Sequence, residues 1–299
     1  MNLFYVSCML VAVSCLSACS MRMPPPDDFS FRPDSLKTYN IHLVRQTQDD
    51  GTQNGKPYSI VWREKAGMTL RFISQEDTLY HLKLCFTKYK RERPDSGQAI
   101  EQDTVAYEPA PTAAQVKNDA NMEIRYWYSL AMGVTVDVWM NKKGEVARVD
   151  GYNRIVDSVV ARCAGDRRTI AYVLRNGLGE EAVRDYLTCV FPFVPARRME
   201  TGKSWVVDQT LTSMAPILLS NIYVLNRRSG DTAWLNVTTY LSARRSEQGL
   251  TYMKGKQTGT ITASYSTGIP YKYRAEGETT IQTDKYYRLT RRSIYAVVR

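Results

Sequence analysis

Four residues near the start of the chain, Leu16, Ser17, Ala18 and Cys19, have the types and order of a lipoprotein processing site. The small side chains of Ser17 and Ala18 suit the groove of a signal peptidase, and cleavage after Ala18 would leave Cys19 as the first residue. The Cys19 thiol could then accept a diacylglyceryl group, which anchors a protein to a membrane without a transmembrane helix. The sequence therefore predicts lipid attachment at Cys19 and removal of residues 1–18 as a signal peptide.

The alternatives are a transmembrane anchor and an ordinary secretory signal. The apolar run from Leu3 to Cys15 is shorter than the ~20 residues that a helix needs to cross a bilayer, which argues against an anchor. No Lys or Arg precedes this run, which departs from a standard signal peptide; an ordinary secretory signal remains the alternative to a lipoprotein signal. The N-terminal cysteine modification is bacterial, and Ser20 rather than an acidic residue follows the cysteine. This predicts retention in the outer membrane, on the periplasmic side.

Other residues that could do chemistry are few and poorly spaced. The only histidines, His42 and His81, occupy expected strand positions, and neither has the closely spaced partners of a zinc site. Cys85 lies four residues from His81 on a strand rising ~3.3 Å per residue, too far apart for His81 to activate the thiol. Glu276 or Glu278 could join a distant acid as in a glycosidase, but nothing marks that choice. We therefore expect no catalytic residue, metal or cofactor, with a hydrolase acting on envelope material as the enzymatic alternative.

Three cysteines follow Cys19 in the chain: Cys85, Cys163 and Cys189. An oxidising compartment permits a disulfide, and Cys163 and Cys189 lie in consecutive helical segments. We predict that these two pair. Two buried free thiols are the alternative, because both residues fall on apolar faces.

The chain carries a formal net charge of +10, and many of its arginines occur in adjacent pairs. In a bacterial envelope such a basic surface would attract anionic lipid head groups, acidic glycans or another envelope protein. Nucleic acid is not an expected partner, because no recognised binding motif accompanies the charge. The alternative is a solvated basic face with no partner. The pairs are Arg167-Arg168, Arg197-Arg198, Arg227-Arg228, Arg244-Arg245 and Arg291-Arg292.

The elements that must position these residues are mostly strands. Tyrosine is abundant, with 20 copies against 7 phenylalanines, and suits half-buried sheet surfaces. Residues 19–38 contain Pro24-Pro25-Pro26 and Pro33 and predict a semi-extended tether. Residues 39–299 predict a single β-rich domain.

Period-two alternation and turn residues predict an antiparallel sheet, curled or closed halfway toward a barrel. Helical spacing of apolar residues predicts a short helical insert over residues 153–190, with Asn153 as its first N-cap. The fold class is therefore mainly β (α+β). The predicted strands begin around Tyr39–Leu43 and include Tyr58–Glu64 and Met68–Ser74 (separated by a turn at Ala66-Gly67), Thr78–Lys88, Val134–Met140, Glu145–Val149, Trp205–Leu211, Ile222–Arg228, Thr232–Ala243, Thr258–Tyr265, Tyr271–Gln282 and Tyr286–Val298.

Three groups of short motifs follow one another along the chain. They are Gly144-Glu145-Val146 before Val149-Asp150-Gly151-Tyr152, Phe191-Pro192 before Met199-Glu200-Thr201-Gly202-Lys203-Ser204-Trp205, and Thr258-Gly259-Thr260 before Ser266-Thr267-Gly268-Ile269-Pro270. Together they resemble an uncharacterised family of β-rich bacterial periplasmic lipoproteins, a domain of unknown function, over residues 39–298. Lys203 stands where that family commonly has Asp. The resemblance implies a periplasm-facing β domain and supplies no catalytic residues.

From these observations we expect an envelope lipoprotein that is not an enzyme. It would bind an amphipathic ligand or an envelope partner on the periplasmic side of the membrane, to which its N-terminal lipid attaches it. A half-barrel with helices over its opening could hold a lipid or a hydrophobic peptide. The alternative is a structural or assembly lipoprotein that docks on an outer-membrane complex through its basic face.

Overall fold

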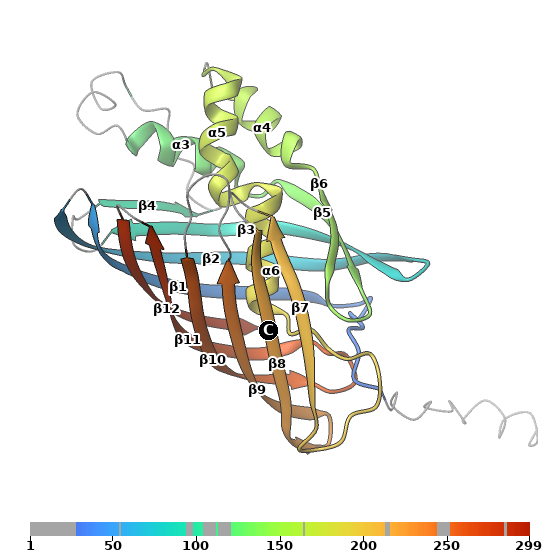
Figure 1. Ribbon diagram of the computed structural model, residues 1–299. Helices are drawn as coiled ribbons and strands as arrows, with labels where there is room; N and C mark the ends of the chain where they lie inside the picture. The colour runs from blue at the N-terminus through green and yellow to red at the C-terminus, as the bar shows by residue number, and fades with distance from the viewer. Residues whose placement is uncertain are drawn as a thin grey trace, which may run out of the picture.

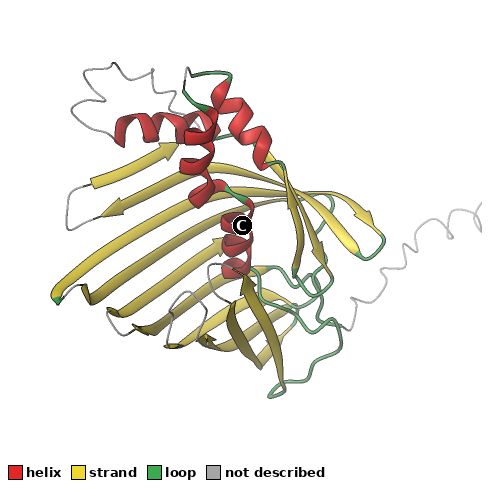
Figure 2. Ribbon diagram, turned by 45° about the horizontal axis from the view of Figure 1, so that its top comes forward, coloured by secondary structure: helices red, strands yellow, loops and turns green. Residues whose placement is uncertain are grey.

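One strongly curved antiparallel sheet makes up most of the protein, and its helices lie against the inner, concave face (Figure 1). The computed structural model describes residues 28–53, 55–93, 98–103, 112, 121–163, 165–212, 216–243, 252–283 and 286–299. Figure 2 shows the sheet as an open trough whose two ends do not join. The mainly β fold with an antiparallel, half-closed sheet and a helical insert is therefore confirmed.

The sheet has twelve strands in the described part of the chain, in the order β6-β5-β3-β2-β1-β12-β11-β10-β9-β8-β7, with β4 paired to β3. All neighbours are antiparallel. The strands are β1 (Thr38–Gln53), β2 (Lys56–Glu76), β3 (Leu79–Arg93), β4 (Gln98–Asp103), β5 (Thr135–Asn141), β6 (Val146–Asp150), β7 (Ser204–Thr212), β8 (Pro216–Ser229), β9 (Thr232–Ala243), β10 (Tyr252–Ser264), β11 (Pro270–Thr283) and β12 (Tyr286–Val298).

The first and last of the described strands meet in the middle of this sheet. β1 pairs with β12 along its length, from Ile41 opposite Val298 to Gln53 opposite Tyr286. All strands of the first half lie on one side of this seam, and all strands of the second half lie on the other. The sheet is therefore two half-sheets joined by a single pair of strands.

Alternation of side chains along the strands sends one set into the core and the other to solvent, as the period-two pattern predicts. In β11, Tyr273 and Ala275 are buried, whereas Lys272, Arg274 and Glu276 are exposed. The inner face packs on the helices, and the outer face is mostly polar.

Four helices in the described residues cover the inner face, and three of them form the predicted insert. α4 begins after Gly151, whose φ of 105° is left-handed and suits glycine, rather than at the predicted cap Asn153. α3 was not predicted. None of the helices in the described ranges is long and apolar enough to cross a bilayer. The helices are α3 (Asn121–Ala131), α4 (Tyr152–Val160), α5 (Arg167–Leu178) and α6 (Glu180–Val190).

The predicted turn at Ala66-Gly67 is wrong, because β2 runs through it without interruption. The register between β2 and β3 shifts at Gly67 and Met68, so this glycine marks a bulge. A Cβ at Gly67 would lie 2.9 Å from the Thr87 hydroxyl oxygen and 3.2 Å from the Lys88 Cβ, so a side chain here would require Thr87 to move.

The predicted tether over residues 19–38 is wrong in its last part. Phe29 and Phe31 are 0% and 1% exposed and belong to the core. The Phe29 ring stacks on Tyr265 at a centroid distance of 5.1 Å, and Phe31 meets Phe191 edge to face at 5.6 Å. The folded domain therefore begins before the predicted residue 39. The predicted signal peptide and lipidation site lie outside the described residues.

Candidate functional site

The outer face of the sheet carries a polar hollow of about 930 Å³ across β1, β12, β11, β10 and β9. A row of five directly opposed residues crosses it: Gln48, Arg291, Glu278, Lys256 and Tyr240. Opposed residues of antiparallel strands point to the same face, so an amide, a guanidinium, a carboxylate, an ammonium and a phenol lie side by side. The hollow thus presents several kinds of polar group to one ligand.

Two further rows flank this one and add hydroxyl and amide groups. Gln46, Ser293, Glu276 and Thr258 form one row, and Thr280 and Lys254 belong to the other.

Charges in the hollow are only partly neutralised. Arg291 contacts Glu278 at 3.0 Å and Asp50 at 2.7 Å, so its charge is balanced. Lys254 and Lys256 have no carboxylate of any described residue within ion-pair distance, and the Lys256 ammonium lies 5.7 Å from the centre of the Tyr240 ring. The hollow therefore holds two lysines available to an acidic ligand.

The backbones of β10 and β11 approach each other closely at this hollow. At Gly277 in β11 a Cβ would lie 2.6 Å from the Lys256 carbonyl oxygen and 2.7 Å from the Gln257 Cα. Backbone atoms cannot give way as a flexible side chain can, so the close approach of β10 and β11 requires a glycine here.

A second, smaller cavity of about 100 Å³ lies on the inner face between α6 and strands β7–β12. Apolar side chains such as Phe193, Val237 and Ile261 line it together with the amides of Asn221 and Gln209. The Gln209 Oε1 atom is buried and accepts no hydrogen bond from any described residue. The volume is below the ~300 Å³ lower range of ligand pockets, and it suits a few water molecules.

A buried ion pair fixes α6 to the inner face beside this cavity. Arg45 on β1 contacts Glu64 on β2 at 2.5 Å and also pairs with Asp185 on α6. The Tyr186 and Tyr89 hydroxyls donate to the second oxygen of Glu64 at 2.7 and 2.9 Å. Burial raises the pKa of Glu64, but the Arg45 charge and the three hydrogen-bonding partners lower it by more, so the net pKa lies below its ordinary value.

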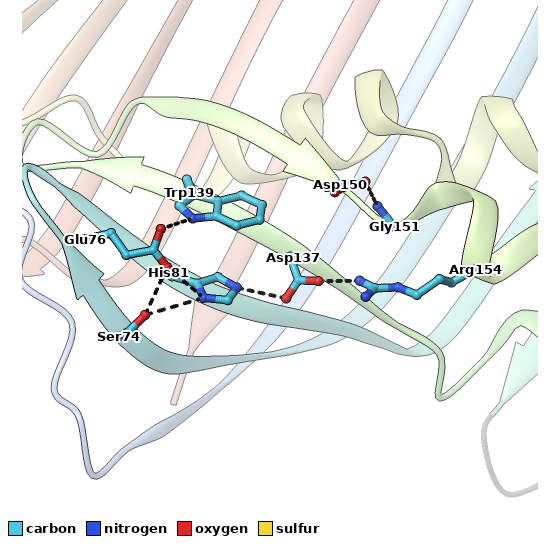
Figure 3. A network of polar contacts seen from close by, with 8 residues as sticks. All are labelled: Ser74, Glu76, His81, Asp137, Trp139, Asp150, Gly151 and Arg154. Atoms are coloured by element: carbon cyan, nitrogen blue, oxygen red, sulfur yellow. Dashed lines mark hydrogen bonds and ion pairs between the residues drawn. The ribbon is translucent and has the colours of Figure 1, made fainter.

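A polar cluster around His81 occupies the outer face of β3 and β5 (Figure 3). The imidazole stacks on Trp139 at a centroid distance of 4.6 Å, and its Nε2 lies 2.9 Å from Asp137. Arg154 of α4 also pairs with Asp137, and Trp139 donates to Glu76 at 3.2 Å. Burial raises the pKa of Asp137, but hydrogen bonds from Arg154 and His81 bring it below its ordinary value. No local pattern of residues predicts this cluster, because β3 and β5 come from separate segments of the chain.

Ser74, His81 and Asp137 together do not form a nucleophilic triad. The Ser74 hydroxyl lies 3.5 Å from His81 Nδ1, which is long for a hydrogen bond, and Glu76 lies equally near the same nitrogen. None of these side chains lines either cavity above. The contacts fix the imidazole between strands and hold α4 against the sheet.

The cysteines and the two glutamates considered in the sequence analysis lie in different parts of the structure. Cys85 lies on β3, where burial raises its thiol pKa. Cys163 follows α4, and the Cys189 side chain lies outside the described part of the chain, so their pairing stays a prediction. Glu276 and Glu278 both line the outer hollow. Among the described residues no group of three or more His, Cys, Asp or Glu could hold a metal ion.

The model of a family described as "Family of unknown function (DUF6263)" matches residues 77–270. No curated protein matches the chain. A lipovitellin structure is similar at a TM-score of 0.45 and 9% identity; the match covers 87% of this chain, which spans 25% of the lipovitellin chain. The translocator domain of the autotransporter NalP from Neisseria meningitidis has a TM-score of 0.30 and 5% identity, over 98% of this chain and 95% of that one. An outer membrane channel from Pseudomonas putida F1 has a TM-score of 0.27 and 7% identity, over 92% and 99%. Similarities at these TM-scores carry no argument about function.

Proposed function

This chain belongs to the DUF6263 family of unknown function, and we propose that it is a lipid-anchored bacterial envelope protein that binds an acidic glycan and catalyses no reaction. The outer-face hollow is the observation that carries this proposal. Its volume of about 930 Å³ lies within the range of ligand pockets, ~300–1,000 Å³.

The chemistry of the hollow suits a sugar that carries acidic groups. The amides of Gln46 and Gln48 and the hydroxyls of Thr258 and Ser293 can donate to and accept from sugar hydroxyls. Tyr240 is 45% exposed and offers an apolar ring face beside a polar hydroxyl, which suits the two-sided surface of a sugar ring.

Charge determines the class of glycan. Lys254 and Lys256 lack carboxylate partners among the described residues. A carboxylate or phosphate on the glycan would pair with their ammonium groups. Hydrogen bonds to charged groups contribute about 1.5–3 kcal/mol each. A neutral sugar would leave both lysines without these bonds.

We expect the Lys254→Gln/Lys256→Gln variant to bind an oligogalacturonate at least about tenfold more weakly than the wild type, because two charge-assisted bonds are lost. Isothermal titration calorimetry measures this, with maltoheptaose as the neutral probe. Lys272→Gln, on the same face of β11 but outside the hollow, serves as the matched control. Equal affinity of the double variant and the wild type, or no binding of the acidic probe, would contradict the proposal.

The membrane attachment and the outer-membrane, periplasm-facing location rest on the sequence at Ala18 and Cys19. Mass spectrometry of the protein purified from a bacterial membrane is expected to find a lipid-modified Cys19 at the mature N-terminus. A mature N-terminus at another residue, without lipid, would contradict the proposed anchor. The proposed glycan site would be unaffected, because calorimetry tests it separately.

An amphipathic ligand in the trough is a second candidate, favoured by the inner cavity. Its aromatic and aliphatic lining includes the buried Gln209 carbonyl without a donor among the described residues. Because the cavity holds only about 100 Å³, α6 would have to move away from the sheet to admit an acyl chain. Native mass spectrometry of detergent-free protein is expected to show co-purified lipid if this candidate is right. Consistently empty protein would exclude it.

A further inference from the structure

The first described residues close one end of the trough and join several loops there. The Phe29 amide donates to the backbone carbonyl oxygen of Arg197, and the Phe31 amide donates to that of Lys142 in the turn between β5 and β6. Figure 1 shows this dark blue start of the described chain beside the β5–β6 turn. The Arg32 amide donates to Thr267 in the turn between β10 and β11. This end of the trough, which we call the N-terminal end, is thus a single connected surface of loops.

Basic side chains are concentrated at the N-terminal end. Six of them are exposed and have no carboxylate of a described residue within ion-pair distance, whereas Asp28 and Asp34 at this end are paired with Arg32 and Lys37. The other exposed carboxylates nearby, Asp77, Glu200 and Asp231, are fewer than the six unpaired cations. The six are Lys142, Lys143, Arg197, Lys203, Arg227 and Arg228.

A leucine projects from the same end. Leu36 is 94% exposed in the loop before β1. Its amide donates to the Asp34 side chain at 2.9 Å, and the Asp34 amide donates to the Tyr39 hydroxyl at 2.8 Å. These bonds hold the loop so that the apolar side chain faces solvent. Transfer of this side chain from water into an apolar phase would lower its free energy.

The predicted lipid lies close to this surface. Between Cys19 and Asp28 the chain spans at most ~30 Å, at 3.3–3.6 Å per residue. The N-terminal end is therefore the part of the domain that the anchor brings nearest to the bilayer. The diacylglyceryl group predicted at Cys19 carries two acyl chains and can hold the protein at the bilayer by itself, so a basic surface near it would orient the domain on anionic head groups.

We propose that the N-terminal end docks flat on an anionic bilayer surface, with the basic side chains over the head groups and Leu36 inserted between them. The proposal rests on the proposed anchor at Cys19 for its cellular setting but not for its chemistry. Docking in this way turns the trough's loops to the membrane and leaves the outer-face hollow open to the side.

Vesicle co-sedimentation of the mature chain carrying Cys19→Ser tests the surface without the lipid. We expect binding to vesicles of phosphatidylcholine with phosphatidylglycerol, weak binding to phosphatidylcholine alone, and a decline with salt. Each Lys or Arg near an anionic surface contributes about 1 kcal/mol, so neutralising Lys142, Lys143, Arg227 and Arg228 with Gln should weaken binding about fivefold per residue. Leu36→Asp should weaken it further.

The matched control is Lys254→Gln/Lys256→Gln, which removes charge from the outer hollow and should leave vesicle binding unchanged. Circular dichroism verifies that each variant is folded. Equal binding to neutral and anionic vesicles, or wild-type binding by the four-residue variant, overturns the proposal. Binding to soluble polyphosphate without binding to vesicles also overturns it. None of these assays uses a glycan or an acylated protein. A negative result would therefore contradict membrane docking without contradicting the proposed glycan binding or the proposed anchor.

Discussion

Replacing Arg45 by methionine is expected to lower the free energy of unfolding by about 3–5 kcal/mol, the usual cost of leaving one charge of a buried pair without its partner. The Arg45 and Glu64 side chains are 18% and 13% exposed, so water can do little to replace the lost contact. Asp185 on α6 loses the same partner. The variant would therefore weaken the attachment of α6 to the sheet.

This loss should depend on pH. In the wild type the pKa of Glu64 lies below its ordinary value, so the pair stabilises the fold above the unfolded-state pKa and loses its effect as pH falls through the folded-state pKa. Without Arg45, burial raises the pKa of Glu64 and mild acid lets it become neutral. The difference in unfolding free energy between variant and wild type is thus expected to be largest near neutral pH and smaller in acid.

Urea unfolding at several pH values measures both effects. Arg274→Met is the matched control, because Arg274 pairs with Glu276 at the surface, where both side chains are more than half exposed. That substitution should change stability by less than ~1 kcal/mol. A loss for Arg45→Met that is as small as the control's would show that the buried pair does not secure α6.

Replacing Phe29 by alanine is expected to cost about 3–5 kcal/mol, the range for large-to-small substitutions in a core. The ring is 0% exposed, stacks on Tyr265 and meets Trp205 edge to face at 6.1 Å. Its loss leaves a cavity at the N-terminal end of the trough, where rings from three distant parts of the chain meet.

Leu36→Ala, seven residues away, provides the control for Phe29→Ala. Leu36 is exposed, so its replacement should change stability by no more than ~0.5 kcal/mol. Thermal unfolding followed by circular dichroism compares the two. Equal stability of Phe29→Ala and Leu36→Ala would mean that the segment before β1 is a tether after all.

Local patterns of apolar and polar residues were sufficient to predict the bounds of β9 and β12 in the second half of the chain. The predicted bounds Thr232–Ala243 and Tyr286–Val298 coincide with β9 and β12, because apolar and polar residues alternate there. Local patterns did not predict α3, because its buried side chains do not follow the spacing of a helix. In α3, Tyr126, Trp127 and Tyr128 are consecutive and all buried, which hides the helical spacing. The prolines near Phe29 likewise suggested a tether, although the neighbouring aromatic rings were core residues.

No local pattern in the sequence predicts the outer hollow. Gln48 on β1 and Lys256 on β10 enter one row only because β12 and β11 lie between their strands. Each residue by itself looks like an ordinary polar position on the wet face of a strand. Sheet order, which depends on contacts between distant segments, was the missing information. The glycine at 277 was visible in the sequence, but its close approach to β10 was not.

The seam between β1 and β12 has a consequence for how the protein is made. Because a chain is synthesised from its N-terminus, β1 is made before the other described strands, whereas its partner β12 is made after them. Until then each half-sheet keeps an open edge on which other chains can add. A chain that contains β1 to β11 but lacks β12 cannot join the two half-sheets and would keep β1 and β11 as open edges.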